Sequence, residues 1–251
     1  MKSEKSKTII LAVMIAIFLV LCMIIAWMVM RGQTRQDETN LSVMEDQQQV
    51  GEQDKSQKAY NEVRPSIVKI DMGEHTGSGV ILSMDDERIL IVSSGHLLTY
   101  YESGVVTFST GGVAVGWVTG ISEHHDVGFM ECFVQDIPED RLKLLCAVNM
   151  DPSAFETLKE GDSVFQVGST TGVAADYYEG TIASLSWYFE EFDDELMYLY
   201  GKVVPGMSGG GTFTENGEFI GLISGSYLEE SCSIPLPYIL EALEEIQENA
   251  E

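Results

Sequence analysis

Basic residues are scarce in this chain of 251 residues. It has 14 Lys and Arg against 40 Asp and Glu, which gives a formal net charge of −26 at pH 7. The imbalance is larger in residues 36–251, which hold 9 of the basic and 39 of the acidic residues, a formal charge of −30. A surface of this sign repels phosphate backbones and anionic headgroups, so the sequence argues against nucleic acid as a partner. The need for solubility is sufficient to explain the negative charge of this region.

Cysteine is also infrequent. The four residues, Cys22, Cys132, Cys146 and Cys232, show no C-x-x-C spacing and no adjacent pair of zinc-ligating histidines. We therefore expect no metal and no cofactor. Three of the thiols lie outside the apolar segment described next, so at least one has no intrachain partner, and buried free thiols are the simplest interpretation. If a disulfide forms, Cys132–Cys146 is the expected pair.

Long apolar runs are absent except at residues 9–30, which contain 22 residues without a charge. About 20 such residues cross a bilayer core, and no small-x-small cleavage motif follows. We interpret this run as an uncleaved membrane anchor behind a short N-terminus, residues 1–8. Three basic residues precede it and two follow, so the positive-inside rule favours a cytoplasmic N-terminus and an extracytoplasmic domain.

The remaining chain divides into a polar stalk, residues 31–58, and a strand-rich domain, residues 59–251. The stalk is rich in Gln, Asp, Glu and Ser and cannot bury a core. Ten to twelve short apolar or alternating runs follow, separated by turn residues; Asn216-Gly217 predicts one hairpin. A helix is expected only at the end, after Pro237. This pattern predicts an all-β barrel or sandwich with a C-terminal helix.

The stretch "VVPGMSGGGTF", residues 203–213, places Ser208 among glycines. A serine hydroxyl becomes a strong nucleophile only when a base takes its proton. Among the four histidines, His96 follows the apolar run "ILIVSS", and Asp126 opens the apolar run "VGFMECF". Taken one at a time, these residues have ordinary explanations: a glycine-rich hairpin end, a core histidine and a strand-edge cap.

Taken together, the three segments resemble a known family. The nucleophile loop Gly-Met-Ser-Gly-Gly, the segment "TGSGVILS…ILIVSSGHLL" and the strand "HHDVGFMEC" are similar to those of trypsin-like, chymotrypsin-fold serine peptidases, in the same order of His, Asp and Ser. The hairpin at residues 217–221 and Ile234-Pro235 resemble the HtrA/Deg-type branch, although no PDZ domain follows. The resemblance runs from about residue 60 to residue 246 and implies a two-barrel fold.

The resemblance also implies a role for each residue. His96 would be the general base, Asp126 would orient it, and Ser208 would attack a polypeptide carbonyl. The backbone N–H groups of Gly206 and Ser208 would form the oxyanion hole. The sequence departs from the family pattern at three positions: Gly95 replaces Ala before the histidine, Met207 replaces Asn or Asp before the serine, and Gly211 replaces Pro after it.

The primary pocket is less well defined. By resemblance, Lys202 would lie at its base and favour an acidic residue before the cut, although the sequence taken alone favours a strand-edge lysine that faces solvent. Ser224, Gly225 and Ser226 would form its wall, and their small size predicts an open pocket. The sequence thus predicts a membrane-anchored serine endopeptidase. The alternatives are a catalytically weak, membrane-tethered module that binds peptides and a purely structural surface protein.

Overall fold

The computed structural model describes residues 55–172, 174–227 and 230–249. The predicted anchor at residues 9–30 and most of the predicted stalk lie outside these residues. The described chain begins with a helix over residues 55–63, followed by a 3-10 turn, η1, at Arg64–Ser66. None of the helices in these ranges is both long enough and apolar enough to cross a membrane.

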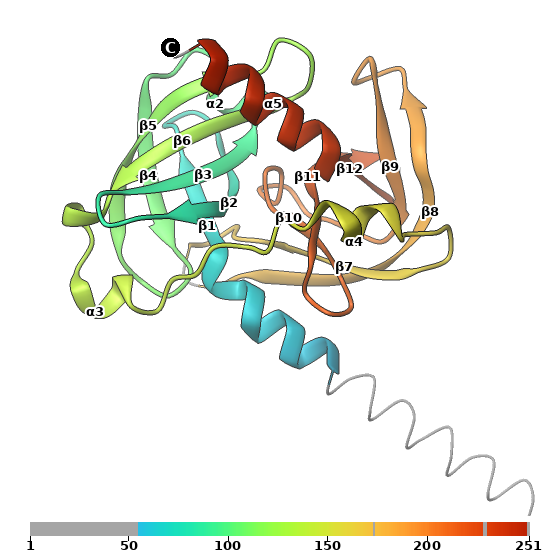
Figure 1. The fold of residues 1–251 in the computed structure, drawn as a ribbon, viewed down its shortest axis with the longest axis horizontal. Coiled ribbons are helices and arrows are strands. Elements are labelled where there is room, and N and C mark those ends of the chain that lie inside the picture. Colours follow the sequence, from blue (N-terminus) through green and yellow to red (C-terminus); the bar gives the residue numbers. More distant parts are fainter. Residues whose placement is uncertain (1–54, 173, 228–229, 250–251) are drawn as a thin grey trace, which may run out of the picture. The chain divides into compact units, whose positions relative to one another are not determined.

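Twelve strands of the described chain form two closed antiparallel barrels (Figure 1). The first barrel has the order β1-β2-β3-β6-β5-β4 and the second has the order β10-β11-β12-β9-β8-β7. The strands are β1 Ile67–Asp71, β2 Thr76–Met84, β3 Arg88–Ser94, β4 Ser103–Phe108, β5 Val113–Ile121, β6 Val127–Phe133, β7 Ser163–Gly168, β8 Asp176–Phe189, β9 Asp194–Tyr200, β10 Gly211–Thr214, β11 Phe219–Tyr227 and β12 Glu230–Pro235. Closure of both sheets leaves no open edge along either barrel, which removes sites for unwanted strand pairing.

The helices are short except for the last. They are α2 Gly95–Leu98, η2 Val134–Asp136, α3 Glu139–Leu142, α4 Pro152–Glu156 and α5 Leu236–Asn249. Helix α5 begins one residue before Pro237, which is tolerated in the first turn because the N–H there needs no intrahelical partner. It contacts strands of both barrels, and Figure 1 shows it in red beside them. The predicted all-β fold with a C-terminal helix is confirmed as a two-barrel chymotrypsin-like fold.

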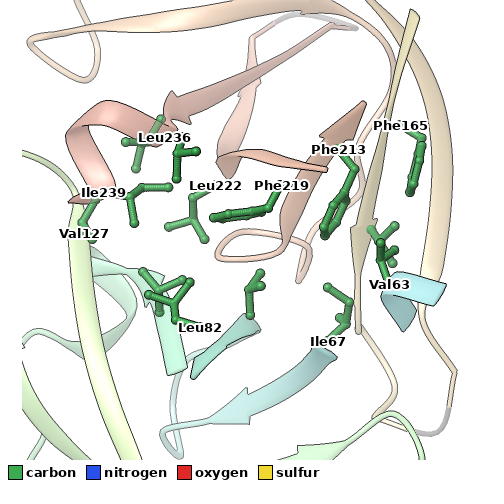
Figure 2. Packing of buried hydrophobic residues seen from close by; sticks show 14 of the residues in the cluster. Val63, Ile67, Leu82, Val127, Phe165, Phe213, Phe219, Leu222, Leu236 and Ile239 are labelled. Atoms are coloured by element: carbon green, nitrogen blue, oxygen red, sulfur yellow. The ribbon is translucent and has the colours of Figure 1, made fainter. Parts of the chain in front are cut away.

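The largest apolar cluster joins the two barrels to each other (Figure 2). Leu82 and Val127 come from the first barrel, Phe219 and Leu222 from the second, and Ile239 from α5. All five side chains are buried. Because removing such a side chain from water contributes roughly 1.5–3 kcal/mol, this shared cluster holds the barrels against each other.

Local sequence signals agree with the strand arrangement. The alternation of Val68 and Ile70 with polar neighbours places both apolar side chains in the core. Asn216-Gly217 joins β10 to β11, and Gly217 has a φ of +83°, the left-handed conformation that such a turn requires. The three described cysteines, Cys132, Cys146 and Cys232, are all free. The disulfide considered between Cys132 and Cys146 is therefore not formed in this structure.

The shared cluster makes a prediction about stability. Phe219→Ala should lower the free energy of unfolding by about 3–5 kcal/mol, since the large cavity left in a closely packed core cannot fully collapse. Tyr100→Ala is the matched aromatic control, because Tyr100 is 99% exposed; it should change the value by less than about 0.5 kcal/mol. Denaturant unfolding followed by circular dichroism measures both. Equal effects of the two substitutions would contradict a shared core between the barrels.

Candidate active site

His96 is placed by the end of β3. The strand stops at Ser94, and the single turn of α2 turns the chain so that His96 is half exposed while Leu97 and Leu98 enter the core of the first barrel. Two apolar anchors directly after the histidine thus fix the backbone that carries the imidazole.

Asp126 lies beside His96 at the start of β6. Its Oδ2 accepts a hydrogen bond from His96 Nδ1 at 2.7 Å, and its Oδ1 accepts one from the His96 backbone N–H at 2.6 Å. The Asp126 carbonyl accepts a third bond, from the Gly95 N–H at 2.9 Å. The carboxylate therefore holds the imidazole with the proton on Nδ1, which leaves Nε2 as a proton acceptor.

The same contact sets the protonation of the histidine. The hydrogen bond that His96 Nδ1 donates to Asp126 raises the pKa of His96 above its ordinary value, and the negative charge of the carboxylate acts in the same direction. Partial burial lowers the pKa, but by less than the hydrogen bond raises it. Asp126 therefore stabilises the imidazolium that forms when His96 accepts a proton.

The His96 titration is directly measurable. In an NMR titration of the full chain, the His96 pKa should lie above about 6.5. Asp126→Asn should bring it down, because the substitution removes both favourable contacts of the charged ring while burial remains. Asp140→Asn, at an exposed carboxylate paired with Arg141, should leave it unchanged. A His96 pKa that does not respond to Asp126→Asn would refute this origin of the shift.

Ser208 approaches from the second barrel, on the segment between β9 and β10. Its Oγ lies 3.2 Å from His96 Nε2. Two further oxygens are within reach: the Ser224 carbonyl, to which the hydroxyl donates at 2.9 Å, and the Ser94 Oγ at 3.1 Å. The structure thus brings Ser208, His96 and Asp126, the three residues that the family resemblance singled out, into one continuous line of hydrogen-bonding groups.

The loop around Ser208 is packed too closely for side chains on the neighbouring glycines. A Cβ on Gly209 would lie 2.2 Å from the Ser78 carbonyl oxygen and 2.4 Å from Ser93 Oγ, and Gly209 has a φ of +83°. A Cβ on Gly210 would lie 2.4 Å from the Val167 carbonyl oxygen. Gly209 and Gly210 therefore permit close packing behind the serine, which a side chain at either position would prevent.

Two glycines separate this packing effect from backbone strain. Gly209→Ala and Gly73→Ala both place a side chain at positive φ, but the space around the Gly73 position is open to 4 Å. Only Gly209→Ala should displace Ser208 from His96, and a shift of about 1 Å can cost on the order of a hundredfold in rate. Reaction of Ser208 with a fluorophosphonate reports the difference. If both variants lost reactivity toward the fluorophosphonate to a similar extent, the strain of a side chain at positive φ, and not close packing, would explain the loss.

The expected oxyanion hole has the backbone that such a site needs. Gly206 has a φ of +95°, and a Cβ there would make only an ordinary 3.4 Å contact with Thr170, so glycine is required for conformation rather than for space. Among the described residues, neither the Gly206 nor the Ser208 N–H has a hydrogen-bond partner. Two free N–H groups beside the serine are available to an incoming oxygen.

The expected pocket residues lie in different environments. Lys202 is exposed and has no ion-pair partner among the described residues. Ser224 is buried, whereas Ser226 is exposed. A Cβ on Gly225 would touch the Phe192 ring at 3.4 Å. Phe192 belongs to the turn between β8 and β9. The small residues at 224–226 predicted an open pocket, but the ring of Phe192 lies against this wall at Gly225.

Two serines that position the site were not predicted. Ser78 on β2 donates from its Oγ to the Gly206 carbonyl and from its N–H to the Ser208 carbonyl, both at 2.7 Å. Ser94 reaches the Ser208 hydroxyl. Both lie in segments already quoted for the resemblance, "TGSGV" and "IVSSGH", but only the register of the two barrels brings them to the loop.

Comparison with known protein families identifies the fold of this site. The model of the trypsin-like peptidase domain matches residues 77–222, more than half of the chain. The chain belongs to the trypsin-like peptidase family. A search of curated proteins found no match.

Solved structures of other trypsin-like proteins share the two-barrel fold at low sequence identity. The HtrA-type protease AlgW with a decapeptide matches with a TM-score of 0.64 and 16% identity, over 77% of this chain and 67% of that one. An inactive serine-to-alanine mutant of Rv3671c from M. tuberculosis H37Rv matches with a TM-score of 0.60 and 16% identity, over 75% of this chain and 90% of that one.

The departures from the trypsin-like pattern have local causes. A Cβ on Gly95 would lie 3.2 Å from Asp126 Oδ1, so an alanine before the histidine would be crowded. Met207 is buried, and its side chain fills the space that Gly168 leaves. Gly211 opens β10 against the ring of Phe213, where a Cβ would lie 2.4 Å from the ring. None of these changes removes a group from the line of Ser208, His96 and Asp126.

Proposed function

We propose that this protein is a serine endopeptidase that cleaves polypeptides through an acyl-enzyme intermediate. The single observation that carries the proposal is the unbroken line from Ser208 Oγ to His96 Nε2, at 3.2 Å, and from His96 Nδ1 to Asp126 Oδ2, at 2.7 Å. A nucleophile, a base in hydrogen-bond reach and a third group that orients the base are the three parts that such catalysis requires. Membership of the trypsin-like peptidase family supports the same chemistry.

The chemical steps follow from this arrangement. Ser208 Oγ attacks the scissile carbonyl carbon while its proton passes to His96 Nε2, and the developing oxyanion is stabilised by the N–H groups of Gly206 and Ser208. His96 then gives the proton to the leaving amine, so the peptide C–N bond breaks and an ester on Ser208 remains. A water molecule, deprotonated by His96, hydrolyses the ester and releases the carboxylic acid. Asp126 stays ionised throughout and stabilises the imidazolium.

The substrate is proposed to be an extended polypeptide whose side chain before the cut enters the space bordered by Lys202 and residues 224–226. The exposed ammonium group of Lys202 would favour an acidic side chain there. The Phe192 ring beside Gly225 limits the room on the wall side. A comparison of otherwise identical peptides with Glu, Gln or Lys before the cut reads this preference directly.

Reaction of the serine tests the proposed function. The full-length chain should be labelled by a fluorophosphonate at Ser208. Ser208→Ala and His96→Ala should each reduce kcat by about 10⁶-fold, and the double variant should lose little more, because the members of a triad act as one unit. Ser186→Ala, at an exposed serine of the second barrel, should keep full activity. Losses that multiply in the double variant would contradict a triad.

A second candidate, a peptide-binding module with little or no catalysis, is favoured by one feature of the loop. The Ser208 hydroxyl donates to the Ser224 carbonyl at 2.9 Å, a shorter contact than the 3.2 Å to His96 Nε2. In that rotamer the proton points away from the base. The fluorophosphonate experiment separates the two functions, since a binding module would retain peptide affinity without being labelled.

We further propose that residues 9–30 anchor the protein in a membrane, with residues 1–8 in the cytoplasm and the peptidase domain, residues 59–251, on the other side. The 22 uncharged residues are long enough to cross a bilayer core of about 30 Å. The polar segment at residues 31–58 would provide a spacer between the membrane and the domain. This topology places the proposed substrates outside the cytoplasm.

Protease accessibility tests the topology. Protease added to intact cells or spheroplasts should digest the domain while a cytoplasmic marker stays whole, because only an extracytoplasmic domain is exposed to it. The intact mass of the purified protein should include residues 1–30. Protection of the domain until the membrane is permeabilised would reverse the orientation, and a mass without residues 1–30 would overturn the uncleaved anchor.

A further inference from the structure

His125, the residue directly before Asp126, lies in a polar cage that the proposed chemistry does not use. Its side chain is only 12% exposed, and its Nδ1 donates to Asp194 Oδ2 at 3.0 Å. Its Nε2 lies 3.9 Å from Glu241 Oε2. The ring stacks on Tyr238 with a centroid distance of 4.1 Å and an interplanar angle of 8°. All three of these contacts are to distant parts of the sequence.

These contacts join three elements at the base of Asp126. Asp194 starts β9 in the second barrel, whereas Tyr238 and Glu241 lie on α5. Helix α5 makes one further connection to the same loop, because Glu245 accepts hydrogen bonds from Ser122 Oγ at 2.7 Å and from the Glu123 N–H at 3.1 Å. The loop between β5 and β6 is thus held from outside the first barrel.

The backbone carries this restraint to the carboxylate. The His125 carbonyl accepts a hydrogen bond from the Val127 N–H at 2.7 Å, which closes a tight turn centred on Asp126. A movement of the His125 side chain therefore changes the direction in which Asp126 projects toward His96. The Asp126 side chain is 27% exposed, so its orientation depends on its backbone as well as on its two hydrogen bonds with His96.

We propose that His125 is a positioning residue of the active site, which fixes Asp126 by binding the loop to Asp194 and to the aromatic face of Tyr238. The inference rests on the proposed peptidase function, since it concerns the same triad. His125 touches neither the nucleophile nor the base, so its effect reaches the chemistry only through Asp126.

The substitutions are chosen to separate the effect of the hydrogen bond to Asp194 from the effect of side-chain size. In His125→Asn the amide nitrogen falls near the position of imidazole Nδ1 and can still donate to Asp194, whereas in His125→Gln it falls near Nε2 and cannot. His125→Ala removes both the donor and the stacking surface. His124→Ala is the matched control, because His124 is exposed and, among the described residues, hydrogen-bonds only through its backbone N–H, which donates to Ser122 Oγ.

In the full-length protein, His125→Ala and His125→Gln should lower kcat on a peptide substrate by roughly 10- to 100-fold, the scale for a misplaced catalytic group. KM should stay unchanged, because the His125 side chain contacts Asp194, Glu241 and Tyr238 rather than the loop of Ser208. His125→Asn should keep kcat within a few fold of wild type, and His124→Ala should match wild type. A fall in kcat for His125→Asn equal to that for His125→Gln, or no fall for His125→Gln, would overturn the proposal.

A spectroscopic signal tests the proposal independently of catalysis. The His96 Nδ1 proton, held between two polar atoms 2.7 Å apart, should give a far-downfield proton NMR resonance. It should shift or be lost through exchange in His125→Gln and persist in His125→Asn and His124→Ala. If the resonance responds to the substitutions in this way but the wild-type protein cleaves no peptide, the peptidase function fails and the positioning role stands. If His125→Gln keeps an unchanged resonance, the positioning role fails whatever the activity.

Discussion

The contact between Ser208 and His96 crosses from one barrel to the other, so the packing of the barrels sets it. His96 and Asp126 belong to the first barrel and Ser208 to the second. Among the described strands, none of the first barrel pairs with one of the second, so strand pairing does not fix the 3.2 Å between Ser208 Oγ and His96 Nε2. The apolar cluster that includes Leu82, Phe219 and Ile239 does so, because a closely packed core leaves little freedom for the two barrels to slide.

Hydrogen bonds further fix the loop of Ser208, whose general position is set by the apolar cluster. Ser78 on β2 of the first barrel bonds to the carbonyls of Gly206 and Ser208, and its Oγ accepts from the Ser169 N–H at 2.8 Å. These bonds hold the nucleophile loop by its backbone, and the Gly206 and Ser208 N–H groups have no hydrogen-bond partner within the part of the chain that the structure describes. The site therefore combines a fixed backbone with free donors, the condition under which a developing negative charge is stabilised without rearrangement.

The sequence predicted the strands and hairpins, which depend on local residue patterns. It did not predict the contacts that depend on how distant segments fit together. The predicted hairpin at Asn216-Gly217 is confirmed, and the alternation at Val68 and Ile70 agrees with the strand found there. The meeting of Ser208 with His96 was predicted only through family resemblance, since no periodicity brings residues 112 positions apart together. The His125–Asp194 bond, the Ser78 contacts and the Phe192 ring at Gly225 arise from the fit between distant segments, for which a single sequence gives no signal.

The most direct test of the central claim is to trap the acyl group on Ser208. The full-length protein is mixed with an excess of an ester substrate, quenched in acid during turnover, and its mass is measured before and after proteolytic mapping. A triad assembled across the two barrels predicts a mass increase equal to the acyl group, located on the peptide that contains Ser208 and absent from Ser208→Ala. Hydrolysis of the ester with no adduct, or an adduct that persists in Ser208→Ala, would contradict the account.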